Sequence, residues 1–322
     1  MRIGRAAGQT DTGRRRLRNE DAFICEPPLF AVADGMGGAR AGEIAAGLAA
    51  AALEEAGSQT LGAEGVAALI VEANRRIWER SLADPKTAGM GTTVTAAVVD
   101  AEEGTVAVGH VGDSRAYQLR AGSIEQLTTD HSLVAELVQS GVLTPEEAER
   151  HPQRSAITRA LGTEETVEVD GFTVVAEPGD VYLICSDGLS TMLSDDEMAA
   201  AIENADRDPH GAADALIRAA NEHGGEDNVT VVLFEMIGGE TVAEPPTGIP
   251  APDDESGPDT LEFLAAELEQ EETPEVDAEP DETVSPSARR FGAGPGGRIA
   301  ALLLVAAIVG LGVVAVYLFL SR

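Results

Sequence analysis

The chain has 322 residues with 56 Asp and Glu against 22 Lys and Arg, a formal net charge of −34. This charge excludes a protein that binds nucleic acid through its overall surface, because such binding needs a basic surface. Hydrophobic residues make up 43% of the chain, so it can build a sizeable core and is not disordered throughout. Only 3% of the residues are aromatic, which predicts a mainly aliphatic core.

Residues 1–237 have the pattern of a globular domain. Short apolar stretches, several of them alternating with polar residues, predict strands at 22–25, 29–33, 92–100, 105–111, 116–120, 171–175, 181–186 and 229–235. Amphipathic or Ala-rich stretches predict two helices between 42 and 80 and others at 132–139, 195–202 and 211–222. Pairs of strands are joined by short turns, such as 102–104. The sequence therefore predicts an α+β domain with predominantly antiparallel sheets rather than a βαβ repeat.

The composition changes after residue 237. Residues 238–288 contain 16 acidic residues, no basic ones and eight prolines. Like charges repel one another and proline blocks helices, so we expect an extended, disordered linker over residues 238–298. Within it, the apolar residues of 260–270 have helical spacing, which is typical of either a transient solvated helix or a docking segment.

Residues 299–320 are 22 uncharged, predominantly apolar residues. As a helix they would extend about 33 Å, enough to cross a bilayer core. A buried core helix would need a domain around it, so we expect a single transmembrane helix. Arg289, Arg290 and Arg298 lie just before it, which favours a cell-membrane protein with its globular domain in the cytoplasm.

Several carboxylates lie at the ends of apolar strands. Asp34 and Asp187 each follow such a strand and precede a glycine, and Asp113 follows the strand at 105–111. Three more acidic residues lie just before predicted strands, namely Glu20, Asp21 and Asp227. If these strand ends converge, each pair of carboxylates at 4 Å would repel by about 4 kcal/mol at an effective dielectric of 20. A divalent cation removes this cost, and all-oxygen ligands suit Mg²⁺ or Mn²⁺.

A cysteine nucleophile of the Cys-x5-Arg type is excluded. Cys185 is the only cysteine beside this constellation, and the sixth residue after it is Thr191 rather than arginine.

In these residues the chain resembles the metal-dependent protein phosphatase family, type 2C, in its bacterial membrane-anchored form. Matching strings follow the family's order over residues 1–237: TDTGRRRLRNED (10–21), VADGMGG (32–38), GTT (91–93), VGDSR (111–115), DHS (130–132), ITRALG (157–162), SDG (186–188) and DNVT (227–230). Each string alone is weak, but the ordered set is strong. The resemblance implies two antiparallel sheets packed face to face, with helices outside.

The resemblance also implies a metal site. Asp34 would bridge two Mn²⁺ or Mg²⁺ ions, with the Gly35 carbonyl on one of them, while Asp187 and Asp227 would complete the other. Further residues would take part in two ways. A third metal would be held by Asp113 and Ser155 together with Asp187, and Glu20 and Asp21 would act mostly through metal-bound water.

For the reaction, the resemblance implies hydrolysis of phosphoserine and phosphothreonine in proteins by a metal-bridging hydroxide. Arg16 would clamp the phosphate, Asn228 would orient the neighbouring ligand, and residues 136–155 would be a mobile flap. Some members have histidine directly after the bridging Asp-Gly, where this chain has Met36. The acid that protonates the leaving group is therefore open, with His131, His151 and metal-bound water as candidates.

The expected partners are phosphorylated proteins, including serine/threonine kinases near the membrane, and the membrane itself. Two other functions remain open at this point. One is a phosphatase of the sigma-factor pathway with the same site, and the other is an inactive homologue that only binds phosphoproteins. The retained carboxylates and Arg16 argue against the inactive homologue.

Overall fold

A computed structural model describes residues 1–37, 41–56 and 62–238 of the chain. Two units divide the chain, Met1–Thr247 and Gly248–Arg322, and all described residues belong to the first. Apart from Gly238, the predicted linker and the predicted membrane span lie outside the described residues. Within the described ranges, no helix has the length and apolar character that crossing a bilayer requires.

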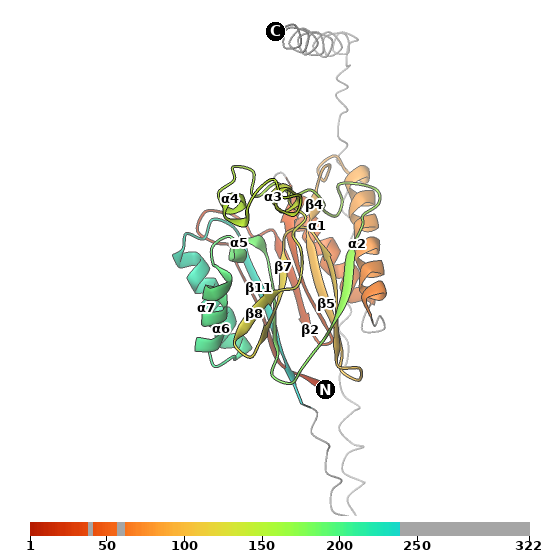
Figure 1. Cartoon of the computed structure of the whole chain (residues 1–322). Coiled ribbons are helices and arrows are strands. Elements are labelled where there is room, and N and C mark those ends of the chain that lie inside the picture. The colour runs from red at the N-terminus through yellow and green to blue at the C-terminus, as the bar shows by residue number, and fades with distance from the viewer. Residues whose placement is uncertain (38–40, 57–61, 239–322) are drawn as a thin grey trace, which may run out of the picture. The chain divides into compact units, whose positions relative to one another are not determined.

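Two antiparallel sheets form the centre of the domain (Figure 1). In the first, the strand order is β1 (Arg2–Asp11), β11 (Val229–Ile237), β10 (Val181–Cys185), β7 (Arg115–Arg120) and β8 (Ser123–Gln126). In the second, it is β2 (Asp21–Glu26), β3 (Leu29–Met36), β5 (Val94–Asp100), β6 (Thr105–Val111) and β9 (Asp170–Val175), with β4 (Gly91–Thr92) paired to β3. The predicted α+β class with antiparallel sheets is confirmed.

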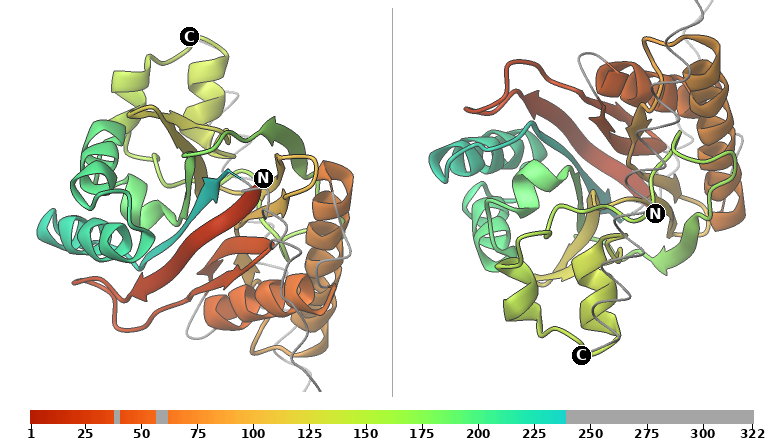
Figure 2. Two further views of the ribbon diagram at one scale, coloured as in Figure 1. Left: turned by 90° about the horizontal axis from the view of Figure 1, so that it is seen from below. Right: turned by 90° about the horizontal axis from the view of Figure 1, so that it is seen from above.

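Helices cover the outer face of each sheet, as the end-on views in Figure 2 show. The pair α1 (Ala41–Ala56) and α2 (Ala63–Ala83) packs on the sheet that contains β3, through buried residues such as Ala49, Leu53, Ile70 and Ile77. The pair α6 (Asp195–Asn204) and α7 (Pro209–Glu222) packs on the other sheet. Small alanines on α1 allow the helix to approach its sheet closely, which explains the Ala-rich composition.

Between the two sheets lies a third cluster of buried side chains. Phe30 stacks on Phe234 with ring centroids 4.1 Å apart, and Tyr182 stacks on Phe234 at 5.0 Å. The rest of this layer is mostly valine and alanine. The core is thus mainly aliphatic, as predicted, but three of the few aromatic residues gather at its centre. Packing both sheets together fixes where their strand ends meet.

The structure adds elements that the sequence patterns do not predict. The strands β1 and β8 lie at the two edges of one sheet. Each edge strand has only one neighbouring strand, so few of its side chains are buried. Ala7 is the one buried hydrophobic residue of β1, and β8 has none. The predicted strand 92–100 is divided at Thr93, because the Thr93 N–H bonds to the Asp34 carbonyl at 2.9 Å. The helices α4 (Pro145–Glu149) and α5 (Asp187–Ser190) are too short for a periodicity signal.

Candidate active site

A cavity of about 220 Å³ opens at the end of the sandwich where β4 and α5 lie (Figure 1). Seven segments of the chain line it: the β1–β2 loop, the end of β3, the junction of β4 and β5, the turn after β6, the segment after α4, the start of α5 and the turn before β11. Nine of the ten predicted site residues line this cavity, namely Arg16, Glu20, Asp34, Gly35, Asp113, Ser155, Asp187, Asp227 and Asn228. The tenth, Asp21, lies behind it and is the cross-strand partner of Asp34.

Close backbone packing holds Asp34 in place. Its N–H donates to Thr93 Oγ1 at 3.1 Å, and its carbonyl accepts the Thr93 N–H at 2.9 Å. The following Gly35 lies against the backbone of Glu20 and Gly42, so a Cβ atom there would overlap with both carbonyl oxygens. The glycine therefore lets three chain segments meet beside the Asp34 carboxylate.

On the other sheet, Asp187 and Asp227 face the cavity from α5 and from the turn before β11. Gly188 is in contact with the Asn228 carbonyl, and any side chain at this position would overlap with it. The sequence interpretation placed Asp187 at the end of a strand. In the structure β10 ends at Cys185, and Asp187 is the first residue of α5.

Burial and mutual repulsion make this group of carboxylates electrostatically costly. Burial, and then the charge of Asp187, raise the pKa of Asp113 to about 8. Burial, followed by the charges of Asp21 and Asp187, raises the pKa of Asp34 well above its usual range. The pKa of Asp187 is raised as well, by burial and then by the charge of Asp227. The site therefore favours a ligand that brings positive charge.

Three carboxylate oxygens in or behind the cavity are buried without a hydrogen-bond partner: Oδ1 of Asp21, of Asp113 and of Asp187. Buried polar atoms are normally satisfied, so these orphans indicate a missing partner that accepts lone pairs. In their present positions, no three His, Cys, Asp or Glu side chains of the described residues already enclose a metal ion. The donor set nevertheless consists of hard oxygen atoms, which fits Mg²⁺ or Mn²⁺.

Arg16 is the cationic side chain that lines the cavity, and it forms an ion pair with Asp227. Burial lowers its pKa, but the charges of Asp227, Asp34 and Asp187 outweigh burial, so the net shift is upward. Half of its side chain stays exposed. A guanidinium in this position can form two parallel hydrogen bonds to a phosphoryl group that enters the cavity.

The Asn228 side chain forms hydrogen bonds to the loop that carries Arg16. Its Nδ2 donates to the carbonyls of Thr12 at 2.9 Å and Arg18 at 2.8 Å, and its Oδ1 accepts the Glu20 N–H at 2.9 Å. The only bond of Asn228 to the Asp227 side chain comes from its backbone N–H, at 2.8 Å. The side chain of Asn228 therefore positions the β1–β2 loop, while its backbone orients Asp227.

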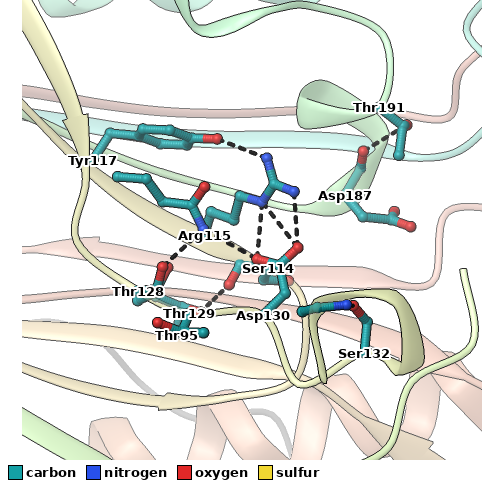
Figure 3. A network of polar contacts seen from close by, with 12 residues as sticks. Thr95, Ser114, Arg115, Tyr117, Thr128, Thr129, Asp130, Ser132, Asp187 and Thr191 are labelled. Atoms are coloured by element: carbon teal, nitrogen blue, oxygen red, sulfur yellow. Dashed lines mark hydrogen bonds and ion pairs between the residues drawn. The ribbon is translucent and has the colours of Figure 1, made fainter. Parts of the chain in front are cut away.

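Next to the cavity-lining carboxylates lies a second polar network (Figure 3). The Arg115 guanidinium donates to both oxygens of Asp130, at 2.9 and 2.8 Å, and to the Tyr117 hydroxyl at 3.1 Å. Arg115 and Asp130 line a larger groove that also contains Asp113 and Asp187. The positive charge of Arg115 counteracts the rise of the pKa of Asp113 and of Asp187.

The predicted flap, 136–155, contains most of α3 (Leu133–Gln139) and all of α4. His131 at its base accepts the Gly112 N–H on Nδ1 at 3.0 Å, and its Nε2 lies 2.9 Å from Arg159 Nη1 and 3.2 Å from Asp170. Both ring nitrogens are thus engaged outside the cavity. His151 does not line the cavity either, so neither histidine is positioned to protonate a leaving group.

Four residues that line the cavity are not among the predicted site residues: Met36, Gly37, Thr93 and Ile157. All four lie within the sequence strings that carry the family resemblance, so those strings could have identified them as cavity residues. Cys185 is buried in β10, and burial raises the pKa of its thiol to about 12, which agrees with the exclusion of a cysteine nucleophile.

The family model for protein phosphatase 2C matches residues 10–214. The chain belongs to the protein phosphatase 2C family. Among its relatives, the serine/threonine phosphatase stp of Listeria monocytogenes is 41% identical over 239 residues, which cover 70% of this chain and 94% of that protein. PstP of Mycobacterium tuberculosis is 41% identical over 238 residues, covering 72% of this chain and 45% of PstP.

Solved structures agree with this membership. The M. tuberculosis phosphatase PstP/Ppp superposes with a TM-score of 0.69 at 40% identity, covering 73% of this chain and all of that structure. A structure of the PstP catalytic domain in complex with two manganese ions has a TM-score of 0.67 at 38% identity, covering 73% of this chain and 99% of that domain. The chain is accordingly a serine/threonine phosphatase of the 2C type, and its two helix-flanked sheets have that fold.

Proposed function

We propose that this phosphatase uses two divalent ions, Mn²⁺ or Mg²⁺, to dephosphorylate phosphoserine and phosphothreonine in proteins, and that it counteracts serine/threonine kinases at the cell membrane. The observation that carries the metal proposal is the convergence of Asp34, Asp187 and Asp227 on one cavity with an arginine beside them. The manganese-containing PstP domain supports the choice of cation.

Asp34, the Gly35 carbonyl, Asp187 and Asp227 would hold the two ions, with Glu20 and Asp21 contributing through water. Asp113, Ser155 and Asp187 would hold a third. Bound metal supplies an acidified water and neutralises the phosphoryl oxygens. Arg16 would hold the phosphoryl group by charge-assisted hydrogen bonds. Asn228 would keep the loop that carries Arg16, and the Asp227 side chain, in position by its hydrogen bonds to both.

We expect the purified full-length chain to hydrolyse p-nitrophenyl phosphate with Mn²⁺ and to lose this activity in excess EDTA. A bound cation acidifies water strongly, whereas the two candidate histidines and Cys185 lie outside the cavity and cannot take over this role. Release of p-nitrophenol is the measurement, and re-addition of Mn²⁺ to the chelated enzyme is the control. Activity that persists in excess EDTA would exclude the metal-based proposal.

The proposed anchor is the apolar segment 299–320, and residues 238–298 would be its tether. A flexible chain of about 60 residues has a root-mean-square reach of about 40–45 Å, and its repelling charges extend it further. This reach would place the cavity within range of kinases anchored in the same membrane. The arginines at 289, 290 and 298 support a cytoplasmic catalytic domain.

Ending the chain after Gly239 is expected to leave p-nitrophenyl phosphate turnover unchanged but to slow dephosphorylation of membrane-bound substrates in cells. The local concentration that a tether supplies is lost, while the cavity is untouched. Phosphorylation of one membrane-bound and one soluble substrate, followed in cells with either form, is the measurement. Equal rates for the membrane-bound substrate would exclude a role for tethering.

A further inference from the structure

The β1–β2 loop concentrates positive charge at the edge of the catalytic cavity. Residues 14–18 read Arg-Arg-Arg-Leu-Arg, and all five are exposed. They hold four of the 22 basic residues of a chain whose net charge is −34. Leu17 is 99% exposed, the highest exposure among the large hydrophobic side chains of the described residues. We call residues 14–18 the basic loop.

Hydrogen bonds hold the backbone of the basic loop in place, although its side chains are exposed. The N–H groups of Arg14 and Arg15 donate to the Gly225 carbonyl at 2.7 and 3.2 Å. Asn228 Nδ2 donates to the carbonyl of Arg18, the last residue of the loop, and to that of Thr12, two residues before the loop begins. An exposed loop that is already ordered loses little conformational entropy when it binds a ligand.

Within the part of the chain that the structure describes, three of the four arginines form no ion pair. Among the described residues, Arg16 pairs with Asp227, whereas Arg14, Arg15 and Arg18 form no ion pair within 4.0 Å. The chain has more than twice as many acidic as basic residues, so partners are abundant elsewhere. Arginines left free beside the phosphate-binding cavity are therefore available to an external anion, which a guanidinium binds in bidentate fashion.

We propose that the basic loop binds the residues next to the phosphorylated side chain of the substrate, and that it selects phosphosites with acidic or additional phosphorylated neighbours. The proposal rests on the phosphatase function proposed above. An extended peptide advances about 3.3 Å per residue, so the nearest neighbours of a phosphoresidue held by Arg16 can reach Arg15 and Arg18. Leu17 would contact an apolar side chain of the same peptide.

The overall charge favours a peptide over a membrane surface as the ligand. Residues 1–238 contain 40 acidic and 18 basic residues, so most of the domain's surface repels acidic proteins and anionic lipids. Only a small, local ligand can contact the basic loop without approaching the remaining acidic surface. A peptide with its phosphate in the cavity meets this condition, whereas an extended anionic membrane does not.

The test compares two phosphothreonine peptides, one with glutamates at the flanking positions and one with glutamines. We expect the full-length chain to prefer the acidic peptide about tenfold, both in kcat/KM with Mn²⁺ and in binding measured by fluorescence anisotropy in EDTA. The double variant Arg15→Gln/Arg18→Gln should lose most of this preference. The matched control Arg2→Gln/Arg218→Gln removes two exposed arginines that also lack ion pairs within the described residues, and it should keep the preference.

The outcomes separate this proposal from the phosphatase function. If neither peptide is hydrolysed but the acidic one still binds better, the phosphatase proposal fails and the role of the basic loop stands. Turnover without any preference, or a preference that the Arg15→Gln/Arg18→Gln variant retains, overturns the role of the loop. If that variant loses binding to phosphatidylserine vesicles while its peptide preference stays, the loop binds membranes instead. A thermal melt verifies that each variant folds.

Discussion

Replacing Asp187 with asparagine is expected to lower kcat/KM in Mn²⁺ by at least about 10³-fold, equivalent to about 4 kcal/mol of transition-state stabilisation. Asp187 lines the cavity together with Asp34 and Asp227, and its Oδ1 is buried without a partner. An amide of the same size keeps the shape of the site but removes a negative charge that the cations need. Hydrolysis of a phosphothreonine peptide over a range of Mn²⁺ concentrations measures the effect.

The same substitution should not lower the thermal stability of the metal-free domain. Metal-free Asp187→Asn is expected to melt no lower than the parent chain, because the substitution removes one of several mutually repelling carboxylates. In the parent chain, Mn²⁺ at about 100 times its dissociation constant should add about 2.7 kcal/mol. This corresponds to about 5–10 °C in Tm. The variant should lose most of this rise, which calorimetry with and without EDTA measures.

Asp180 offers a matched control, since it is a buried carboxylate that does have partners. Its oxygens accept from Arg120 Nε at 2.8 Å, Arg120 Nη2 at 2.6 Å and Gln118 Nε2 at 3.1 Å. Asp180→Asn should therefore destabilise the domain by about 2 kcal/mol without changing the Mn²⁺ response. If both variants lost stability equally in EDTA, repulsion among the cavity carboxylates would not be the reason for the metal requirement.

Local sequence patterns identify Asp34 and Asp187 as candidate site residues. Both residues follow a run of apolar residues and precede a glycine, and in the structure Gly35 and Gly188 make close backbone contacts that a side chain would block. Both signals lie within a few residues of each side chain. The sequence patterns alone do not indicate which segments meet, and the ordered set of family strings supplied that information.

Contacts that join distant segments are the part that sequence patterns do not predict. Arg115 and Asp130 are 15 residues apart, and nothing local to either residue indicates that they form a bidentate pair. The edge strand β1 pairs with β11, which lies more than 200 residues later in the sequence. A pattern within a few residues of β1 cannot indicate this partner. Residue type alone suggests His131 and His151 as acids, and the structure places both outside the cavity.

Asn228 illustrates the same limit and leads to a second strong prediction. Asn228→Ala should destabilise the domain by about 3 kcal/mol, because it leaves the carbonyls of Thr12 and Arg18 and the N–H of Glu20 without their partner. The expected fall in Tm is about 6–12 °C. Because the released loop carries Arg16, we also expect kcat/KM for phosphopeptides to fall at least about tenfold, mostly through a higher KM.

Asn74→Ala separates this positioning role from a general loss of stability. Asn74 is 1% exposed and Asn228 is 5% exposed. The Asn74 side chain also makes three bonds, donating to the carbonyls of Glu164 and Glu165 and accepting the Gly162 N–H, but it does so away from the cavity. Asn74→Ala should lower Tm by about as much as Asn228→Ala does. It should leave KM unchanged when both variants are assayed well below their melting temperatures. An equal rise in KM for the two variants would mean that stability, and not the position of the Arg16 loop, controls phosphate binding.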